Sequence, residues 1–171
     1  MTSIESTLAT RVSAKAAAVR STAKFARPSD TAAYAAGDVV SDRASIAKVI
    51  EFPEVGGSGL IKSAQMLMGE TDTASFVLLL FDQEPTNVQD NAAYAPSEAD
   101  LEKLVGMVTF LNADKTNLGT NLELYRMDEA HLDLAYTSDS GKLYGILVTN
   151  SVWTPASATA FTLALSCEVD Q

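Results

Sequence analysis

The chain has 171 residues, of which 47% are hydrophobic and 20% charged, and its formal net charge is −10. This composition predicts one globular domain with a sizeable core and argues against a disordered chain. The longest apolar run, Phe76–Phe81, is too short to span a bilayer, no secretory signal is recognisable, and the single cysteine, Cys167, excludes a disulfide within the chain.

Charge is distributed unevenly along the sequence. Residues 1–27 hold five basic residues against Glu5, a net charge of +4, whereas the remainder carries −14. A cationic segment of this kind is typical of binding to an acidic protein surface or to phosphate. The acidic remainder repels nucleic acid, which we therefore do not expect as a partner.

The first segment, residues 2–20, has helical features. Thr2 and Glu5 fit a capping box, and apolar residues recur at helical spacing. Because a lone helix of this length is marginal in water, it needs a partner surface, and we predict a docking arm over residues 1–26. An arm folded back on its own domain and a transit peptide are the alternatives. The residues expected to bind a partner are Ile4, Leu8 and Val12 on the apolar side and Arg11, Lys15, Arg20, Lys24 and Arg27 by charge.

Residues 27–42 are predicted to join the arm to the folded body. Pro28 blocks continuation of a helix, and Ser29 and Asp30 favour a turn. Tyr34 offers one large apolar surface with a polar tip, and we include it among the partner-binding residues.

From residue 37 onward the pattern predicts about eight or nine short strands separated by turn residues. Residues 75–81 are apolar on both faces, which is typical of a central strand, and residues 161–169 alternate between apolar and polar. Ser97 and Asp100 predict one capped helix over Ser97–Leu104. We therefore predict an all-β domain over residues 27–171, an antiparallel β-sandwich of jelly-roll type with one short helix. The other predicted strands cover residues 46–52, 60–68, 105–111, 122–124, 132–136 and 143–149.

Two connections are notable for their composition. Asp82–Pro96 forms a long polar loop, a position where contact sites are common but where most segments are solvated connections. Gly56–Gly59 lacks the residues of a phosphate-binding loop or a nucleophile elbow, so we interpret it as a flexible turn.

The sequence offers little for catalysis or cofactor binding. His131 is the only histidine, and a surface pairing with a carboxylate explains it without catalysis. One Cys and one His cannot supply a zinc site, and the acids of the 82–90 loop do not follow a calcium-loop pattern. We expect Cys167 to be buried and Trp153 to fill an edge of the core, and we predict no enzyme activity, no catalytic residue, no metal and no cofactor.

Four segments carry a resemblance to small tailed-bacteriophage virion proteins of the minor-capsid or head-decoration type. They are residues 27–42 ("RPSDTAAYAAGDVVSD"), 51–61 ("EFPEVGGSGLI"), 143–150 ("LYGILVTN") and 154–165 ("TPASATAFTLAL"). The resemblance implies a capsid cement or decoration protein with no active site, made in the bacterial cytoplasm and located in the virion. It implies the major capsid protein as partner and a homo-oligomer, with a trimer favoured. A tail, neck or fibre-base component is the alternative, followed by a carbohydrate-binding module that would use Trp153 and Tyr144.

Overall fold

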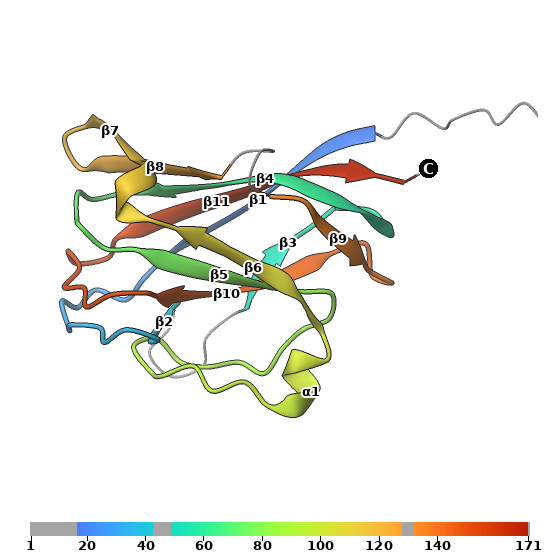
Figure 1. Ribbon diagram of the computed structural model, residues 1–171. Helices are drawn as coiled ribbons and strands as arrows, with labels where there is room; N and C mark the ends of the chain where they lie inside the picture. The colour runs from blue at the N-terminus through green and yellow to red at the C-terminus, as the bar shows by residue number, and fades with distance from the viewer. Residues whose placement is uncertain (1–16, 43–48, 128–131, 171) are drawn as a thin grey trace, which may run out of the picture.

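The computed structural model describes residues 17–42, 49–127 and 132–170. They form two antiparallel sheets packed face to face with one short α-helix, which confirms the predicted all-β sandwich (Figure 1). The six-stranded sheet contains β1 (Ala17–Ala26), β4 (Ser58–Met68), β7 (Lys115–Gly119), β8 (Leu122–Met127), β9 (Leu134–Thr137) and β11 (Ala160–Val169). The five-stranded sheet contains β2 (Val39–Val40), β3 (Ile50–Phe52), β5 (Phe76–Phe81), β6 (Leu104–Phe110) and β10 (Leu143–Thr149).

The strands pair in the order of a jelly roll. The first strand, β1, pairs with the last, β11; β2 and β3 pair with β10; β4 pairs with β8 and β9; and β5 pairs with β6. Because β2 and β3 meet successive parts of β10, and β8 and β9 meet successive parts of β4, each of these couples fills one strand position. Such pairing results when one long hairpin is rolled into two sheets, so the predicted jelly-roll arrangement is confirmed.

The main core lies between the two sheets. On β11 the alternation predicted from sequence holds, because Phe161, Leu163, Leu165 and Cys167 are all at most 2% exposed. Phe76 lies at the centre of an aromatic group, with its ring centroid 5.3 Å from that of Trp153 and 5.9 Å from that of Phe161, both edge to face. Burial of such side chains contributes about 1.5–3 kcal/mol each, which makes this group a main source of stability.

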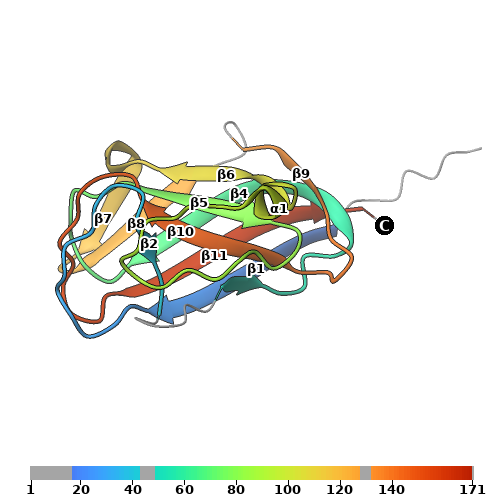
Figure 2. The same ribbon diagram turned by 90° about the horizontal axis from the view of Figure 1, so that it is seen from below.

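Residues 82–103 form a third layer over the five-stranded sheet, where the sequence suggested a solvated loop or a contact site. Outward-facing apolar residues of that sheet, including Ile146 and Val148, are at most 8% exposed because this segment covers them (Figure 2). Backbone hydrogen bonds hold the segment in place: Val39 N–H donates to Ala92 O at 2.9 Å and Asn91 N–H donates to Val39 O at 2.9 Å. This cover explains why β5 is apolar on both faces, as expected for a strand flanked by β10 and β6.

The predicted helix is present but shorter. α1 spans Glu98–Leu101, and Leu104, its expected last residue, begins β6. Ser97 is the N-cap, and its side chain forms the predicted capping box with Asp100. Asp100 also accepts hydrogen bonds from the backbone N–H and the hydroxyl of Thr86, at 2.9 and 3.1 Å. The helix therefore anchors the covering segment as well as capping itself.

Replacing Asp100 with Asn should reduce the acid sensitivity of the fold. The Thr86 N–H, assisted by Ser97, lowers the pKa of Asp100 from 3.8 to about 2, although burial acts in the opposite direction. Stability linked to this lowered pKa is present above about pH 4 and is lost as the pH falls toward 2. We expect Asp100→Asn to cost about 1 kcal/mol near neutral pH and less at about pH 2.5, measured by urea unfolding. A cost that does not change with pH would contradict this assignment.

The helical prediction is wrong where the structure tests it, at residues 17–20. These residues belong to β1, a ten-residue edge strand paired with β11 from Ala17↔Val169 to Ala26↔Ala160. Two-residue alternation places Ser21 and Ala23 inside, and the Phe25 ring stacks on Phe161 at 5.1 Å. Pairing along a whole strand outweighs the helical preference of the alanines, because tertiary contacts override local propensity. Residues 17–26 of the expected arm are thus part of the sheet, and residues 1–16 lie outside the described residues.

The glycine stretch is partly a turn and partly strand. Gly56, with a φ of 82°, forms the turn, and Ser58 already begins β4. A Cβ on Gly59 would overlap the carbonyl oxygen of Glu168 on β11. This glycine is therefore required for close approach of two strands, and not for flexibility.

Candidate interaction surface

The nine residues expected to bind a partner fall into three groups. Arg20 and Lys24 are exposed on β1, whereas Arg27 and Tyr34 are 2% and 1% exposed. The last two are corrections to the sequence prediction, because buried side chains cannot reach a partner. The remaining five, Ile4, Leu8, Arg11, Val12 and Lys15, lie outside the described residues.

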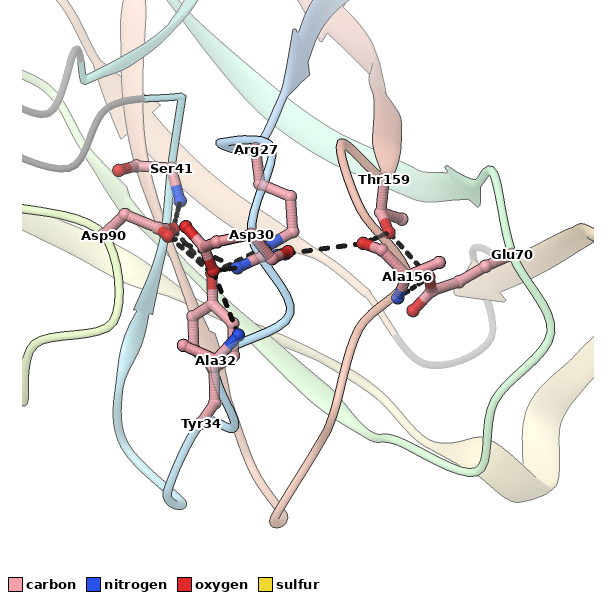
Figure 3. A network of polar contacts seen from close by, with 9 residues as sticks. All are labelled: Arg27, Asp30, Ala32, Tyr34, Ser41, Glu70, Asp90, Ala156 and Thr159. Atoms are coloured by element: carbon pink, nitrogen blue, oxygen red, sulfur yellow. Dashed lines mark hydrogen bonds and ion pairs between the residues drawn. The ribbon is translucent and has the colours of Figure 1, made fainter.

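Arg27 is the centre of a buried polar cluster at one end of the sandwich (Figure 3). Its Nε donates to the Tyr34 hydroxyl at 2.8 Å, and its Nη1 donates to Asp30 O at 2.8 Å and to Ala156 O at 3.4 Å. Its Nη2 lies 3.1 Å from Asp30 Oδ1 and 3.6 Å from Asp90 Oδ2. The guanidinium carbon also lies 4.9 Å from the centroid of the Tyr34 ring. The charge of Arg27 is therefore satisfied within the fold.

Tyr34 and Asp90 complete this cluster. The Tyr34 hydroxyl lies 2.7 Å from both carboxylate oxygens of Asp90, and Ser41 N–H donates to Asp90 Oδ1 at 2.8 Å. Burial raises the pKa of Tyr34, and the hydrogen bond to Asp90 adds to this, so Tyr34 stays a neutral donor. Burial also raises the pKa of Asp90, although Ser41, Tyr34 and Arg27 oppose it. Burial lowers the pKa of Arg27, but Tyr34 and the two acids outweigh this and keep it charged.

A second buried carboxylate, Glu70, was not recognised in the sequence. Although it is only 6% exposed, it accepts hydrogen bonds from Trp153 Nε1 at 2.9 Å, from Ala156 N–H at 2.6 Å and from the Thr159 hydroxyl at 2.6 Å. These donors lie on the connection from β10 to β11. Ala156 also accepts from Arg27, so the Glu70 and Arg27 clusters adjoin (Figure 3). Both clusters fix the end of the sandwich, and apart from Asp30, whose side chain is 48% exposed, their charged groups are buried.

Trp153 fills the core, as predicted. It is 1% exposed and its ring lies 5.0 Å from that of Tyr34. A sugar-stacking role requires an exposed ring face, which this burial rules out for Trp153. Cys167 is also buried as predicted, and burial raises its pKa to about 11, which leaves an unreactive thiol.

Sites for metal or catalysis are not apparent in the part of the chain that the structure describes. Within those residues no group of three or more His, Cys, Asp and Glu side chains is placed to hold a metal ion. His131 lies outside them. Nor do they contain a helix long and apolar enough to cross a membrane.

A groove of about 580 Å³ runs beside the edge of β1. It is lined by residues 22–26 of β1, by residues 49–51, and by Ser41, Asp42 and Pro53. Because Asp42 and Val49 directly border residues 43–48, which the structure does not describe, we assign no ligand to this groove.

The outer face of the six-stranded sheet is the broad sheet surface that the described residues leave uncovered. Its outward side chains are aligned by strand register in three rows that cross the sheet. We call these twelve residues the cationic face: Arg20, Ser166 and Ser63; Thr22, Ala164, Gln65 and Arg126; Lys24, Thr162, Leu67, Leu124 and Thr116.

The charge of this face is opposite to that of the molecule. It holds three basic residues, Arg20, Lys24 and Arg126, and no acidic residue. The nearest exposed acid on these strands is Glu168, one row beyond Arg20 and opposite Ala18, whereas Glu123 on β8 is buried. Arg20 donates to Gln65 at 3.2 Å, and among the described residues neither Lys24 nor Arg126 has an ion-pair partner. This arrangement can attract an acidic surface.

Comparison with known proteins gives weak similarities. No family model matches the sequence, and no curated protein matches it. A chain of the cyanophage Pam1 capsid asymmetric unit is 10% identical over 99% of this chain and 98% of that chain, with a TM-score of 0.41. A chain of the full particle of heated Israeli acute paralysis virus is 12% identical over 90% and 71%, with a TM-score of 0.30. A family two carbohydrate esterase from Cellvibrio japonicus is 11% identical over 82% and 37%, with a TM-score of 0.15. Scores below 0.5 at such identities do not establish a shared fold.

Proposed function

We propose that this chain is a structural protein of a tailed-phage particle, a cement or decoration protein that binds the major capsid protein of the head. The observation that carries the proposal is that the four segments of the sequence resemblance contact one another in the fold. Residues 27–42 and 154–165 meet at Arg27, whose N–H donates to Thr159 O at 3.1 Å. Residues 143–150 pair with Val39–Val40 and with Ile50–Phe52. The resemblance therefore falls on one contiguous unit of structure.

The fold and the charge support the same proposal. The jelly roll is an architecture of viral capsid domains, although lectin domains and cupins share it, so the support from fold is analogy. The large core between the sheets and the satisfied polar clusters at one end suit a protein that must persist on a particle. We include in the proposal a homo-oligomer, with a trimer favoured, and an arm formed by residues 1–16. A tail, neck or fibre-base location remains the alternative within the same class.

Particle binding tests this function. The probe is a phage particle produced from the genome that encodes this chain with the corresponding gene deleted, to which the purified chain is added. We expect saturable binding with a copy number that follows the number of shell subunits, measured by quantitative mass spectrometry of washed particles. A few copies per particle would favour the tail or neck, and no binding would overturn the proposal.

Two deletions separate the arm from the body. Removal of residues 1–16 should leave a folded body whose free energy of unfolding is within about 1 kcal/mol of that of the full chain. This body should bind particles more weakly than the full chain does. Removal of residues 1–26 should prevent stable folding, because it deletes β1 and the Phe25–Phe161 contact. Both are checked by urea unfolding and by particle binding. Undiminished binding by the shorter deletion would remove the arm from the proposal.

A further inference from the structure

We infer that the cationic face is a docking surface for an acidic surface of a different protein. The inference rests on the proposed function and deepens it, because it names the side of the sandwich that contacts the shell. It begins with the difference between the two sheets. The five-stranded sheet is covered on its outer side by residues 82–103, whereas the cationic face has no such layer among the described residues (Figures 1 and 2).

The layout of charge on the cationic face is that of a protein interface. Its centre consists of neutral side chains that are half-buried or buried, such as Thr162, Ala164 and Leu67. Its charges lie toward the sides, with Arg20 and Lys24 on the edge strand β1 and Arg126 on β8. A neutral centre with a charged rim is the usual arrangement where two proteins meet. The antiparallel register aligns these side chains across neighbouring strands, so they form one continuous contact surface.

The positive charge of the cationic face indicates that its partner is acidic. Within the described residues, the three cations stand without an acid on the face, while the opposite side of the molecule exposes Glu84, Glu98 and Glu102. At physiological ionic strength charges interact over about 8 Å, so the local charge of the face decides the contact even though the whole chain is acidic. Like charges oppose pairing of two cationic faces. An acidic surface is the complementary one.

A second copy of this chain and a nucleic acid fit this face less well. A second copy would have to offer its acidic α1 side, and because the two sides are opposite, such contacts would stack copies without closing, unlike the closed symmetry of most oligomers. Double-stranded DNA is bound by dense basic patches that contact several phosphates, and single strands by such patches with exposed aromatic rings for stacking. The cationic face has three basic residues and no aromatic residue.

A charge reversal with a matched control tests the inference. The full-length variant Arg20→Glu/Lys24→Glu changes two exposed residues of the face, and the control Lys103→Glu/Lys142→Glu changes two lysines away from it; both variants take the net charge from −10 to −14. Binding is measured on the same gene-deleted particles at about 50 mM and about 500 mM NaCl. We expect the face variant to bind at least about tenfold more weakly at low salt, with a slower association rate and a loss of the wild-type salt dependence. We expect the control variant to bind within about twofold of wild type.

Every outcome of this experiment is informative. If the wild-type chain binds and the face variant binds as well as the control variant, the inference is overturned and the proposed function stands. If the wild-type chain does not bind the particles, both are overturned. Wild-type binding to double-stranded DNA that the face variant loses would identify nucleic acid as the occupant, and a wild-type oligomer that the face variant loses would identify a second copy. Either result overturns the inference. The neutral variant Arg20→Gln/Lys24→Gln should be intermediate, and equal melting temperatures exclude a folding defect.

Discussion

Arg27→Met is expected to lower the free energy of unfolding by about 3–5 kcal/mol. Methionine retains an apolar side chain of similar length against the rings of Tyr34 and Trp153, so the substitution removes mainly the guanidinium. The variant loses the donors that now satisfy the Tyr34 hydroxyl and the carbonyl oxygens of Asp30 and Ala156. It also leaves Asp90, which is 8% exposed, without a cation. Urea unfolding at neutral pH measures the loss.

The pH dependence of this loss distinguishes charge from packing. Because Arg27 lowers the pKa of Asp90, its removal should raise that already raised pKa further. A carboxyl whose pKa is raised by folding contributes stability below its unfolded pKa and loses that contribution as the pH rises through the folded value. The deficit of Arg27→Met should therefore be largest near neutral pH and should shrink as the pH falls toward about 4.

Two control variants test whether the loss in Arg27→Met comes from the buried charge. Arg126→Met removes an exposed arginine and should change the free energy of unfolding by less than about 0.5 kcal/mol. Arg27→Met/Asp90→Asn removes the isolated charge as well and should be more stable than Arg27→Met alone. If Arg27→Met were as stable as Arg126→Met, the cluster would not hold this end of the sandwich together.

The strands were predictable where the pattern reflects only the local environment. β5 is apolar on both faces because one side meets the main core and the other the covering segment, and β11 alternates because only one side faces the core. The capping box of α1 depends on Ser97 and Asp100 alone, three residues apart. In these cases the residues nearest in sequence also determine the structure, so the prediction needs no knowledge of the fold.

The polar clusters could not be predicted because their partners are distant in sequence. Arg27 resembles the basic residues before it, yet its environment is made by Asp90 and Ala156, which come from other parts of the chain. Glu70 has no neighbour in sequence that marks it as buried, and its donors lie 83 to 89 residues away. Charge alone assigns such residues to the surface, where Lys, Arg, Asp and Glu are usually found. The cationic face required the strand register, since its rows combine residues from five strands.

Glu70→Ala is expected to be among the most destabilising single substitutions, with a loss of about 4 kcal/mol. The change leaves the Trp153 indole N–H, the Ala156 N–H and the Thr159 hydroxyl without their acceptor, and each buried donor left unsatisfied costs about 1–3 kcal/mol. Urea unfolding measures the total loss. Because Trp153 is the only tryptophan, its fluorescence reports this site directly, and its emission should shift to longer wavelength in the folded variant as water enters.

Glu51→Ala is the matched control for this substitution. Glu51 forms an ion pair with Lys142, in which Lys142 Nζ lies 2.9 Å from Glu51 Oε1 and both side chains are about 40% exposed. Because such an exposed pair contributes little, Glu51→Ala should change the free energy of unfolding by less than about 1 kcal/mol. Glu70→Gln should fall between the two, because its amide keeps one acceptor oxygen but turns an NH₂ toward groups that are themselves donors. Since Ala156 also accepts from Arg27, Glu70→Ala combined with Arg27→Met should lose less than the sum of the two single losses. Strict additivity would mean that the two clusters hold the β10–β11 connection independently.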